Sequence, residues 1–300
     1  LVVKEVYSLS LKQKITPWRN LLGAALLLML SLGLNVSGMT LFYVPVTESL
    51  QFSQAQFSLY FTLTTIVCAI TTPFAGKIVA KFRESLRILL LICLLTNAVC
   101  LFLYSKCNNL YQFYCLSIIR GIAFALDSGI PSTLIANDWF EDRRTMALSL
   151  VFVGSTIGGV LFNSVSHYFI DTYGWRTAYS ALGVIAVVVS VIIFLLITKT
   201  PSGMGLQPYR TKRAQKQAAV SMANDGFTFR QALKRPELWM ICIAQLMINI
   251  TSLAILQNVA NSLVLEHGHT SGFATIAVNL IQVGCVVGML GQGWILDRIG

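Results

Sequence analysis

Residues 118–159 read IIRGIAFALDSGIPSTLIANDWFEDRRTMALSLVFVGSTIGG, and they hold the most informative features of the chain. An apolar helical run carries Arg120 and Asp127. A short charged loop follows, from Asp138 to Arg144, and a glycine-rich apolar run begins after it. An ionisable side chain inside a membrane helix is costly, so such residues are candidates for a functional site. The composition of the whole chain indicates whether these runs cross a bilayer.

The composition is that of an integral membrane protein. Hydrophobic residues make up 55% of the chain and charged residues only 11%, whereas ordinary soluble domains carry about 25% charged residues. A helix needs about 20 apolar residues to cross a bilayer. Eight runs of that kind predict an all-α membrane bundle: Leu21–Tyr43, Gln54–Ala75, Leu86–Tyr104, Leu110–Ala136, Met146–Ser166, Thr177–Ile197, Leu238–Val264 and Ala274–Leu296.

The positive charges indicate the topology of the bundle. Nearly all Lys and Arg residues fall in the N-terminal segment and in every second connection, whereas the other connections hold only Lys106 and Arg176. Cytoplasmic loops of membrane proteins carry the excess of Lys and Arg. Both ends of this chain are therefore expected in the cytoplasm. The same pattern accounts for the net charge of +10 without a nucleic-acid partner.

A short motif occurs twice. Residues 293–300 read GWILDRIG and match the pattern Gly-x-x-x-Asp-(Arg/Lys)-x-Gly through Gly293, Asp297, Arg298 and Gly300. Residues 76–83 keep Gly76 and Lys81 but have Ala80 and Arg83 at the other two positions. The pattern resembles the cytoplasmic loop signature of the major facilitator superfamily, which follows helices 2 and 8 of that fold. The resemblance implies a gating role for these residues.

Further segments are similar to one branch of that family, the oxalate–formate and monocarboxylate transporter-like proteins. They are residues 137–140 with Arg143 and Arg144, the run 154–159 with Gly154, Gly158 and Gly159, residues 173–176, and residues 229–239. The resemblance implies two halves of six helices each. It divides the chain into an N-terminal half at 1–198, a cytoplasmic central loop at 199–236, and the start of the second half at 237–300. The chain would then cover helices 1–8 of twelve, and the natural gene is expected to continue with about 100 or more mostly apolar residues.

Arg120 is the first candidate for substrate binding. It lies near the centre of its span, where a cation can hold a carboxylate through a bidentate fork. The alternative is a structural arginine bonded to carbonyl groups or to Asp127. Asp127 follows seven residues later on the same face, roughly 10 Å along the helix. It either carries a coupling proton or braces the cytoplasmic helix ends through basic residues of the second loop.

Amide side chains inside the spans predict a polar cavity between the two halves. An amide in a membrane helix often only joins neighbouring helices, so each residue is a candidate and not an assignment. Gly154, Gly158 and Gly159 are interpreted as helix-packing positions. The candidate amides are Asn35, Asn249, Gln257, Asn258, Asn279 and Gln282.

The sequence thus predicts a monomeric secondary transporter of the plasma membrane. It would move a small organic anion, in particular a carboxylate, by alternating access, coupled to a proton or to a counter-anion. A ligand sensor built on the same fold is the alternative. A membrane enzyme is disfavoured because no HExxH, GxSxG or phosphate-loop motif is present and no His pair lies within a span. No Cys or His cluster has the spacing of a metal site, so neither a metal nor a cofactor is expected.

Overall fold

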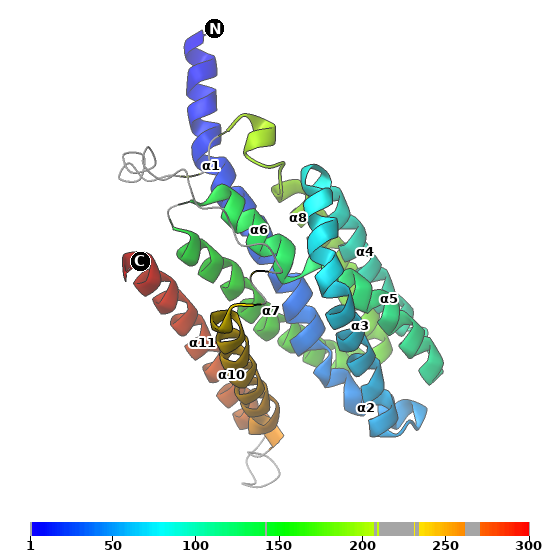
Figure 1. Ribbon diagram of the computed structural model, residues 1–300. Helices are drawn as coiled ribbons and strands as arrows, with labels where there is room; N and C mark the ends of the chain where they lie inside the picture. Colours follow the sequence, from blue (N-terminus) through cyan, green and yellow to red (C-terminus); the bar gives the residue numbers. More distant parts are fainter. Residues whose placement is uncertain are drawn as a thin grey trace. The chain divides into compact units, whose positions relative to one another are not determined.

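The computed structural model describes residues 2–141, 143–206, 209, 231, 234–261 and 271–299. Two compact units are present, one of residues 1–210 with 288–300 and one of residues 211–287. Each unit is described by itself. In both units the described elements are helices (Figure 1), and residues 140 and 209 add one isolated β-bridge in the first.

The predicted all-α membrane fold is confirmed. Within the described residues, seven helical segments are long and apolar enough to cross a bilayer, and the predicted run Leu238–Val264 is not among them. A polypeptide in lipid must satisfy its backbone hydrogen bonds internally, and helices do this within one segment. The helices of the first unit are α1 (Val2–Leu28), η1 (Met29–Gly38), η2 (Thr40–Phe42), α2 (Tyr43–Leu50), α3 (Gln54–Lys81), η3 (Arg83–Ser85), α4 (Leu86–Tyr104), α5 (Leu110–Asp127), α6 (Gly129–Trp139), α7 (Arg144–Tyr173), α8 (Trp175–Leu196) and η4 (Ser202–Met204).

Two helices follow the central connection. They are α10 (Pro236–Asn261) and α11 (Ser271–Ile299), and the C-terminal part of α11 belongs to the first unit. Residues 210–230 and 262–270, as well as Gly300, lie outside the described residues. The predicted division at residues 198 and 236 therefore stays a prediction.

The first predicted span differs from a regular helix. Residues Met29–Gly38 form a π-helix between α1 and η2. π-Helical turns are rare and occur frequently at functional sites. Here the π-helical segment carries Ser31 and Asn35, two side chains that return below in the candidate site.

The fourth predicted span was expected to be continuous, and this prediction is wrong in one respect. The helix breaks at Ser128, between α5 and α6, where the backbone leaves the helical region with φ −94° and ψ −127°. The cause is local: Pro131 has no N–H to donate to the carbonyl of Asp127, and a proline ring clashes with the carbonyl four residues before it. Asp127 therefore ends its helix at the level of the candidate site.

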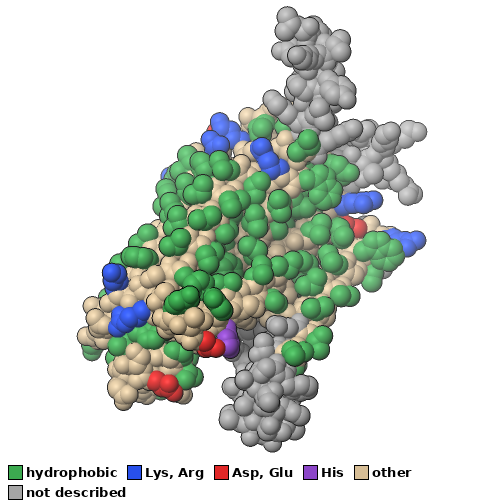
Figure 2. Space-filling view, turned by 180° about the vertical axis from the view of Figure 1, so that it is seen from behind, with side chains coloured by type: hydrophobic (Ala, Val, Ile, Leu, Met, Phe, Trp, Pro, Cys, Tyr) green, Lys and Arg blue, Asp and Glu red, His purple; other side chains and the backbone are tan. Residues whose placement is uncertain are grey.

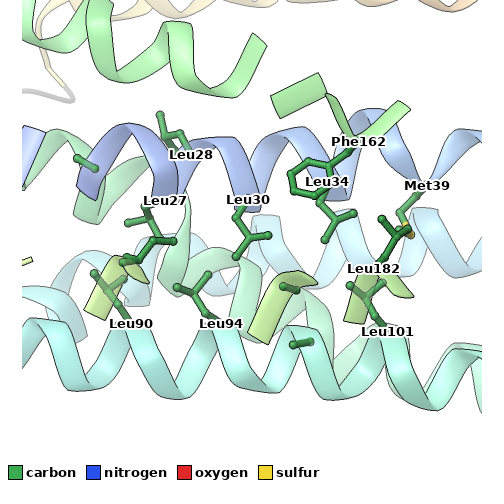
Figure 3. Packing of buried hydrophobic residues seen from close by; sticks show 14 of the residues in the cluster. Leu27, Leu28, Leu30, Leu34, Met39, Leu90, Leu94, Leu101, Phe162 and Leu182 are labelled. Atoms are coloured by element: carbon green, nitrogen blue, oxygen red, sulfur yellow. The ribbon is translucent and has the colours of Figure 1, made fainter. Parts of the chain in front are cut away.

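The core of the first unit is formed by leucine-rich faces of several helices. Figure 3 shows Leu27, Leu30 and Leu34 of the first span opposite Leu90, Leu94 and Leu101 of α4. The principal helix pairs are α3 with α5, α4 with α8, and η1 with α7. These pairs place residues of α1/η1, α3, α4, α5 and α8 around one buried interior.

Glycine lets α7 approach the first span closely. A Cβ atom on Gly154 would collide with the carbonyl oxygen of Ala25, and one on Gly158 with that of Met29. Small residues permit this backbone approach in membrane bundles, where packing, not hydrophobicity, holds helices together. The Gly159 amide nitrogen lies at the same contact, facing Gly33.

The outer surface of the helices is apolar. Ile70, Phe74, Ile92, Val184 and Leu195 are each about half exposed or more, at 64%, 59%, 59%, 58% and 68%. On the face seen in Figure 2, hydrophobic side chains cover the middle of the helices, while Lys and Arg side chains gather toward their ends. This is the surface expected of helices in contact with lipid.

Candidate functional site

Arg120 is buried near the middle of the described bundle. Only 2% of the residue is exposed, and its Nε and Nη2 atoms have no hydrogen-bond partner among the described residues. The guanidinium Cζ lies 5.7 Å from the centre of the Tyr104 ring, a cation–π contact. Nε and Nη2 form one edge of the guanidinium, and such an edge can bind a carboxylate through two parallel hydrogen bonds.

Asp127 is bonded to neutral side chains and not to Arg120. Ser31 donates to Oδ1 at 3.1 Å, and Asn97 donates to Oδ2 at 2.7 Å. The Ser31 hydroxyl also lies 2.9 Å from the backbone carbonyl oxygen of Asp127, which the break before Pro131 leaves without its helical donor. The alternative role predicted for Asp127 was to hold the cytoplasmic helix ends through basic residues of the second loop. In the structure, Arg83 of that loop pairs with another carboxylate, that of Asp138.

A small cavity brings the polar residues of three helices together. Its polar lining consists of Ser31, Asn35, Asn97, Arg120 and Asp127, and its apolar lining of Leu30, Leu34, Leu94, Leu101 and Ala186. The space admits about one water molecule. The arrangement is therefore closed around these groups, with one cationic and one acidic side chain facing the same small space.

Asn35 lies at this cavity. Its side-chain amide donates to the Ser31 carbonyl at 2.6 Å, while its Oδ1 atom has no partner among the described residues. Asn97 was not a candidate from the sequence, although it contacts Asp127 directly. The available signal was an amide in the middle of the very apolar span Leu86–Tyr104.

An aromatic cluster lies beside Arg120. The ring of Tyr104 packs at 5.9 Å from the ring of Tyr60 and at 5.5 Å from the ring of Tyr179. All three tyrosines are at most 1% exposed. The phenol groups of Tyr60 and Tyr179 are close enough to the guanidinium of Arg120 to interact with it electrostatically. Tyrosines near helix ends are common in membrane proteins, so the positions of these residues in the sequence are not a signal of a site.

The candidates of the second half belong to the other unit. Asn249 on α10 is exposed, and its amide donates to the carbonyl of Gln245 at 2.8 Å. Gln282 on α11 is buried, with 6% exposed. The side chains of Gln257, Asn258 and Asn279 lie outside the described residues. The predicted contribution of these amides to a shared site stays a prediction.

Two contacts involve the repeated motif at the helix ends. After α3, which ends at Lys81, the Arg83 side chain pairs with Asp138 through two contacts, of which Nε to Oδ2 measures 3.3 Å. Gly76 has open space around its Cβ position. The first copy of the motif therefore has an ion pair even though Ala80 replaces its acidic residue.

The second copy contacts the first turn of α7. The carboxylate of Asp297 accepts hydrogen bonds from the backbone N–H groups of Thr145 and Met146, at 3.2 and 3.0 Å. These N–H groups have no partner within the helix, and a negative charge is favourable at a helix N-terminus. Beside this contact, Gly293 packs against Ser149, Arg143 and Arg144 are exposed, and Arg298 stacks over Trp294 at 5.1 Å.

Comparison with known proteins identifies the relatives of this chain. A family model described as Major Facilitator Superfamily matches residues 22–300. The oxalate:formate antiporter of Oxalobacter formigenes is 28% identical over 293 residues, which cover 94% of this chain and 64% of the antiporter. A probable hexose phosphate transport protein of Chlamydia trachomatis is 24% identical over 216 residues, covering 60% of this chain and 47% of that protein.

Two further similarities bear on fold and function. The membrane sensor protein UhpC of Salmonella typhimurium is 22% identical over 236 residues, covering 76% of this chain and 53% of the sensor. The solved structure of the proton:xylose symporter XylE matches with a TM-score of 0.57 at 16% identity, covering 97% of this chain and 70% of that one. The chain thus spans roughly half to two thirds of the length of these curated relatives.

Proposed function

Because the chain belongs to the Major Facilitator Superfamily, we propose that the protein is a secondary transporter that moves a small organic anion, in particular a carboxylate. It works as a monomer in the plasma membrane, with its N-terminus in the cytoplasm. The substrate crosses by alternating access, in which the two six-helix halves rock around a site near the bilayer midplane. The relatives reported above are named as transport proteins or as a membrane sensor, and none of them is named as an enzyme.

The observation that carries the proposal is the unpartnered edge of Arg120. A buried guanidinium is retained at mid-membrane only if its charge is compensated, and no described carboxylate forms an ion pair with it. A bound carboxylate supplies two oxygen atoms to Nε and Nη2 and compensates the charge at once. The interaction is strong because water is nearly absent and the local dielectric constant is low.

Asp127 is proposed as the coupling residue. It faces the same small cavity as Arg120, so together the two side chains are close to neutral. An arriving monoanion adds one negative charge to this enclosed space. That charge is balanced either by a proton on Asp127, which gives symport, or by the departure of another anion, which gives exchange.

The relatives support an anionic substrate. Oxalate and formate, which name the Oxalobacter relative, are carboxylates, and the hexose phosphate of the Chlamydia relative is also an anion. The likeness to the xylose symporter bears on the fold alone.

The second candidate function is a ligand sensor, which the similarity to the membrane sensor protein UhpC favours. A sensor binds the same kind of anion but does not move it against its gradient. Purified full-length protein in liposomes separates the two functions. We expect accumulation of labelled oxalate or pyruvate when a proton gradient or an internal counter-anion is supplied. Binding of these anions without accumulation would favour the sensor, and the absence of both would refute the anion proposal.

A further inference from the structure

Two buried tyrosine hydroxyls next to Arg120 have no hydrogen-bond partner among the described residues. They belong to Tyr60 on α3 and Tyr179 on α8, residues that are 1% and 0% exposed. The two phenols are near each other and near the guanidinium of Arg120. The two hydroxyls are within reach of each other, and no other described group forms a hydrogen bond with either of them.

The third tyrosine of the cluster is different. The hydroxyl of Tyr104 lies 3.0 Å from the hydroxyl of Ser117, and Ser117 donates to the carbonyl of Phe113 at 2.7 Å. A neighbouring phenol in the same apolar surroundings is thus fully satisfied within the protein. The missing partners of Tyr60 and Tyr179 are therefore specific to these two side chains and not a general property of the cluster.

Four buried hydrogen-bond donors lie in the cluster formed by Arg120 and the three tyrosine rings. They are Nε and Nη2 of Arg120 and the hydroxyls of Tyr60 and Tyr179. A buried donor without an acceptor lowers the free energy of unfolding, and the great majority of buried polar groups in proteins are paired. Phenylalanine at positions 60 and 179 would preserve the ring packing without this cost. The packing of the rings therefore does not account for the presence of the two hydroxyl groups.

We infer that Tyr60 and Tyr179 complete an anion site with Arg120 and contact the substrate directly. The inference rests on the proposed function, in which Arg120 holds a carboxylate. Arginine has donors and no acceptor, and a phenol donates its single proton readily to an oxygen anion or carbonyl. A site that offers four donors selects a ligand rich in acceptor oxygens.

The geometry of the donors indicates the class of ligand. The two oxygens of one carboxylate occupy the Nε–Nη2 edge of the guanidinium. The two phenols then donate to the remaining lone pairs of the ligand's oxygens. A 2-oxo acid such as pyruvate or a short dicarboxylate such as oxalate offers them more acceptor oxygens than acetate or formate, which have a single carboxylate.

Access to this site requires movement of the helices that carry the tyrosines. Phe42 stacks on Tyr179 with ring centres 3.9 Å apart, and Phe57 lies against Tyr60 at 4.6 Å. The donors are therefore covered by aromatic rings in the arrangement described here. Small shifts between packed helices are among the ways in which alternating-access proteins open and close.

The test deletes the phenol hydroxyl of one tyrosine at a time in the full-length protein. Tyr60→Phe, Tyr179→Phe and the double variant keep the aromatic ring and delete only the hydroxyl. In liposomes, we expect kcat/KM for labelled oxalate and pyruvate to fall by about 10-fold or more per hydroxyl, since a hydrogen bond to a charged group is among the stronger ones. Uptake of labelled acetate and formate should fall by a smaller factor, because these ligands offer the phenols fewer acceptor oxygens.

Thermal unfolding provides a second readout. Deleting an unpartnered hydroxyl should leave the Tm of the ligand-free protein unchanged or raised, while the increase in Tm caused by oxalate is lost. Tyr104→Phe is the matched control, because its hydroxyl bonds to Ser117. It should lower the Tm of the ligand-free protein and keep the preference for oxalate over acetate.

The outcomes distinguish this inference from the proposed function. If the unmodified protein transports all four anions and both phenylalanine variants do the same, the phenol contacts are refuted and the carboxylate transporter stands. If none of the four anions is transported or raises the Tm, both proposals fall. A phenylalanine variant with a lowered ligand-free Tm would assign the hydroxyl a structural role and overturn the inference.

Discussion

Arg120 is the residue whose substitution tests the proposed anion anchor most directly. Arg120→Gln removes the positive charge and the Nε–Nη2 pair of donors. The kcat/KM for a carboxylate should therefore fall by about 100-fold or more, since each hydrogen bond to a charged group contributes about 1.5–3 kcal/mol. Arg120→Lys keeps the charge but loses the fork, and it should retain part of the activity. The measurement is initial uptake by the full-length protein in liposomes, after confirming that each variant inserts.

A substitution of Asp127 tests the alternative that Arg120 has only a structural role. If Arg120 only balances the charge of Asp127, the double variant Arg120→Gln/Asp127→Asn should restore both folding and uptake. If Arg120 binds the substrate, the double variant should stay inactive. Uptake by Arg120→Gln at the level of the unmodified protein would show that the anchor lies elsewhere. The absence of a hydrogen bond between the two side chains favours the anchor, because Asp127 is already satisfied by Ser31 and Asn97.

At the scale of helices, the contact between η1 and α7 depends on glycine. Gly158→Ala places a Cβ against the carbonyl of Met29, and overpacking of this kind lowers the free energy of unfolding by about 1–3 kcal/mol. The Tm of the detergent-solubilised protein should fall accordingly. Because η1 also carries Ser31 and Asn35, displacement of this element should disturb the polar site as well.

Gly76→Ala is the matched control within α3. A Cβ at Gly76 meets no atom within 4 Å, and alanine is favoured over glycine in a helix interior by about 0.5–1 kcal/mol. The Tm should therefore stay the same or rise. Equal losses of Tm in both variants would show that the close approach at Gly158 does not limit the stability of the bundle.

For the whole molecule, the testable property is its orientation in the membrane. The distribution of Lys and Arg predicts that the connection before α5 lies outside the cell and the connection after α8 inside it. An impermeant maleimide applied to intact cells should label Asn109→Cys and not Ser202→Cys. The reverse result would invert the topology, and with it the side on which the repeated motif lies.

Cys107 should contribute little background in this experiment. The residue is 4% exposed, and burial raises the pKa of its thiol to about 11. The thiol is therefore protonated near neutral pH, and only a thiolate reacts efficiently. A Cys107→Ser variant, compared with the unmodified protein, separates this contribution from that of the exposed Cys115, and the difference should grow as the pH approaches 11.

Properties that depend on the local composition of the chain were predictable from the amino-acid sequence alone. Apolar runs of sufficient length predicted the helices, and the bounds Leu86–Tyr104 agree with the structure at both ends. The repeated motif and the segments around Arg143 and Gly154 indicated the family. Arg120 and Asp127 stood out because a charge in an apolar span is visible without any knowledge of its surroundings.

The contacts between side chains of different helices could not be predicted from the sequence. Ser31 and Asp127 are 96 residues apart in the chain, and Asn97 and Asp127 are 30 apart. The rotation of each helix about its axis selects these neighbours, and hydropathy carries no information about that rotation. The break before Pro131 exposes a carbonyl that Ser31 then satisfies. The unpartnered hydroxyls of Tyr60 and Tyr179 depend on three helices packing around Arg120, so only the folded arrangement distinguishes them from the satisfied hydroxyl of Tyr104.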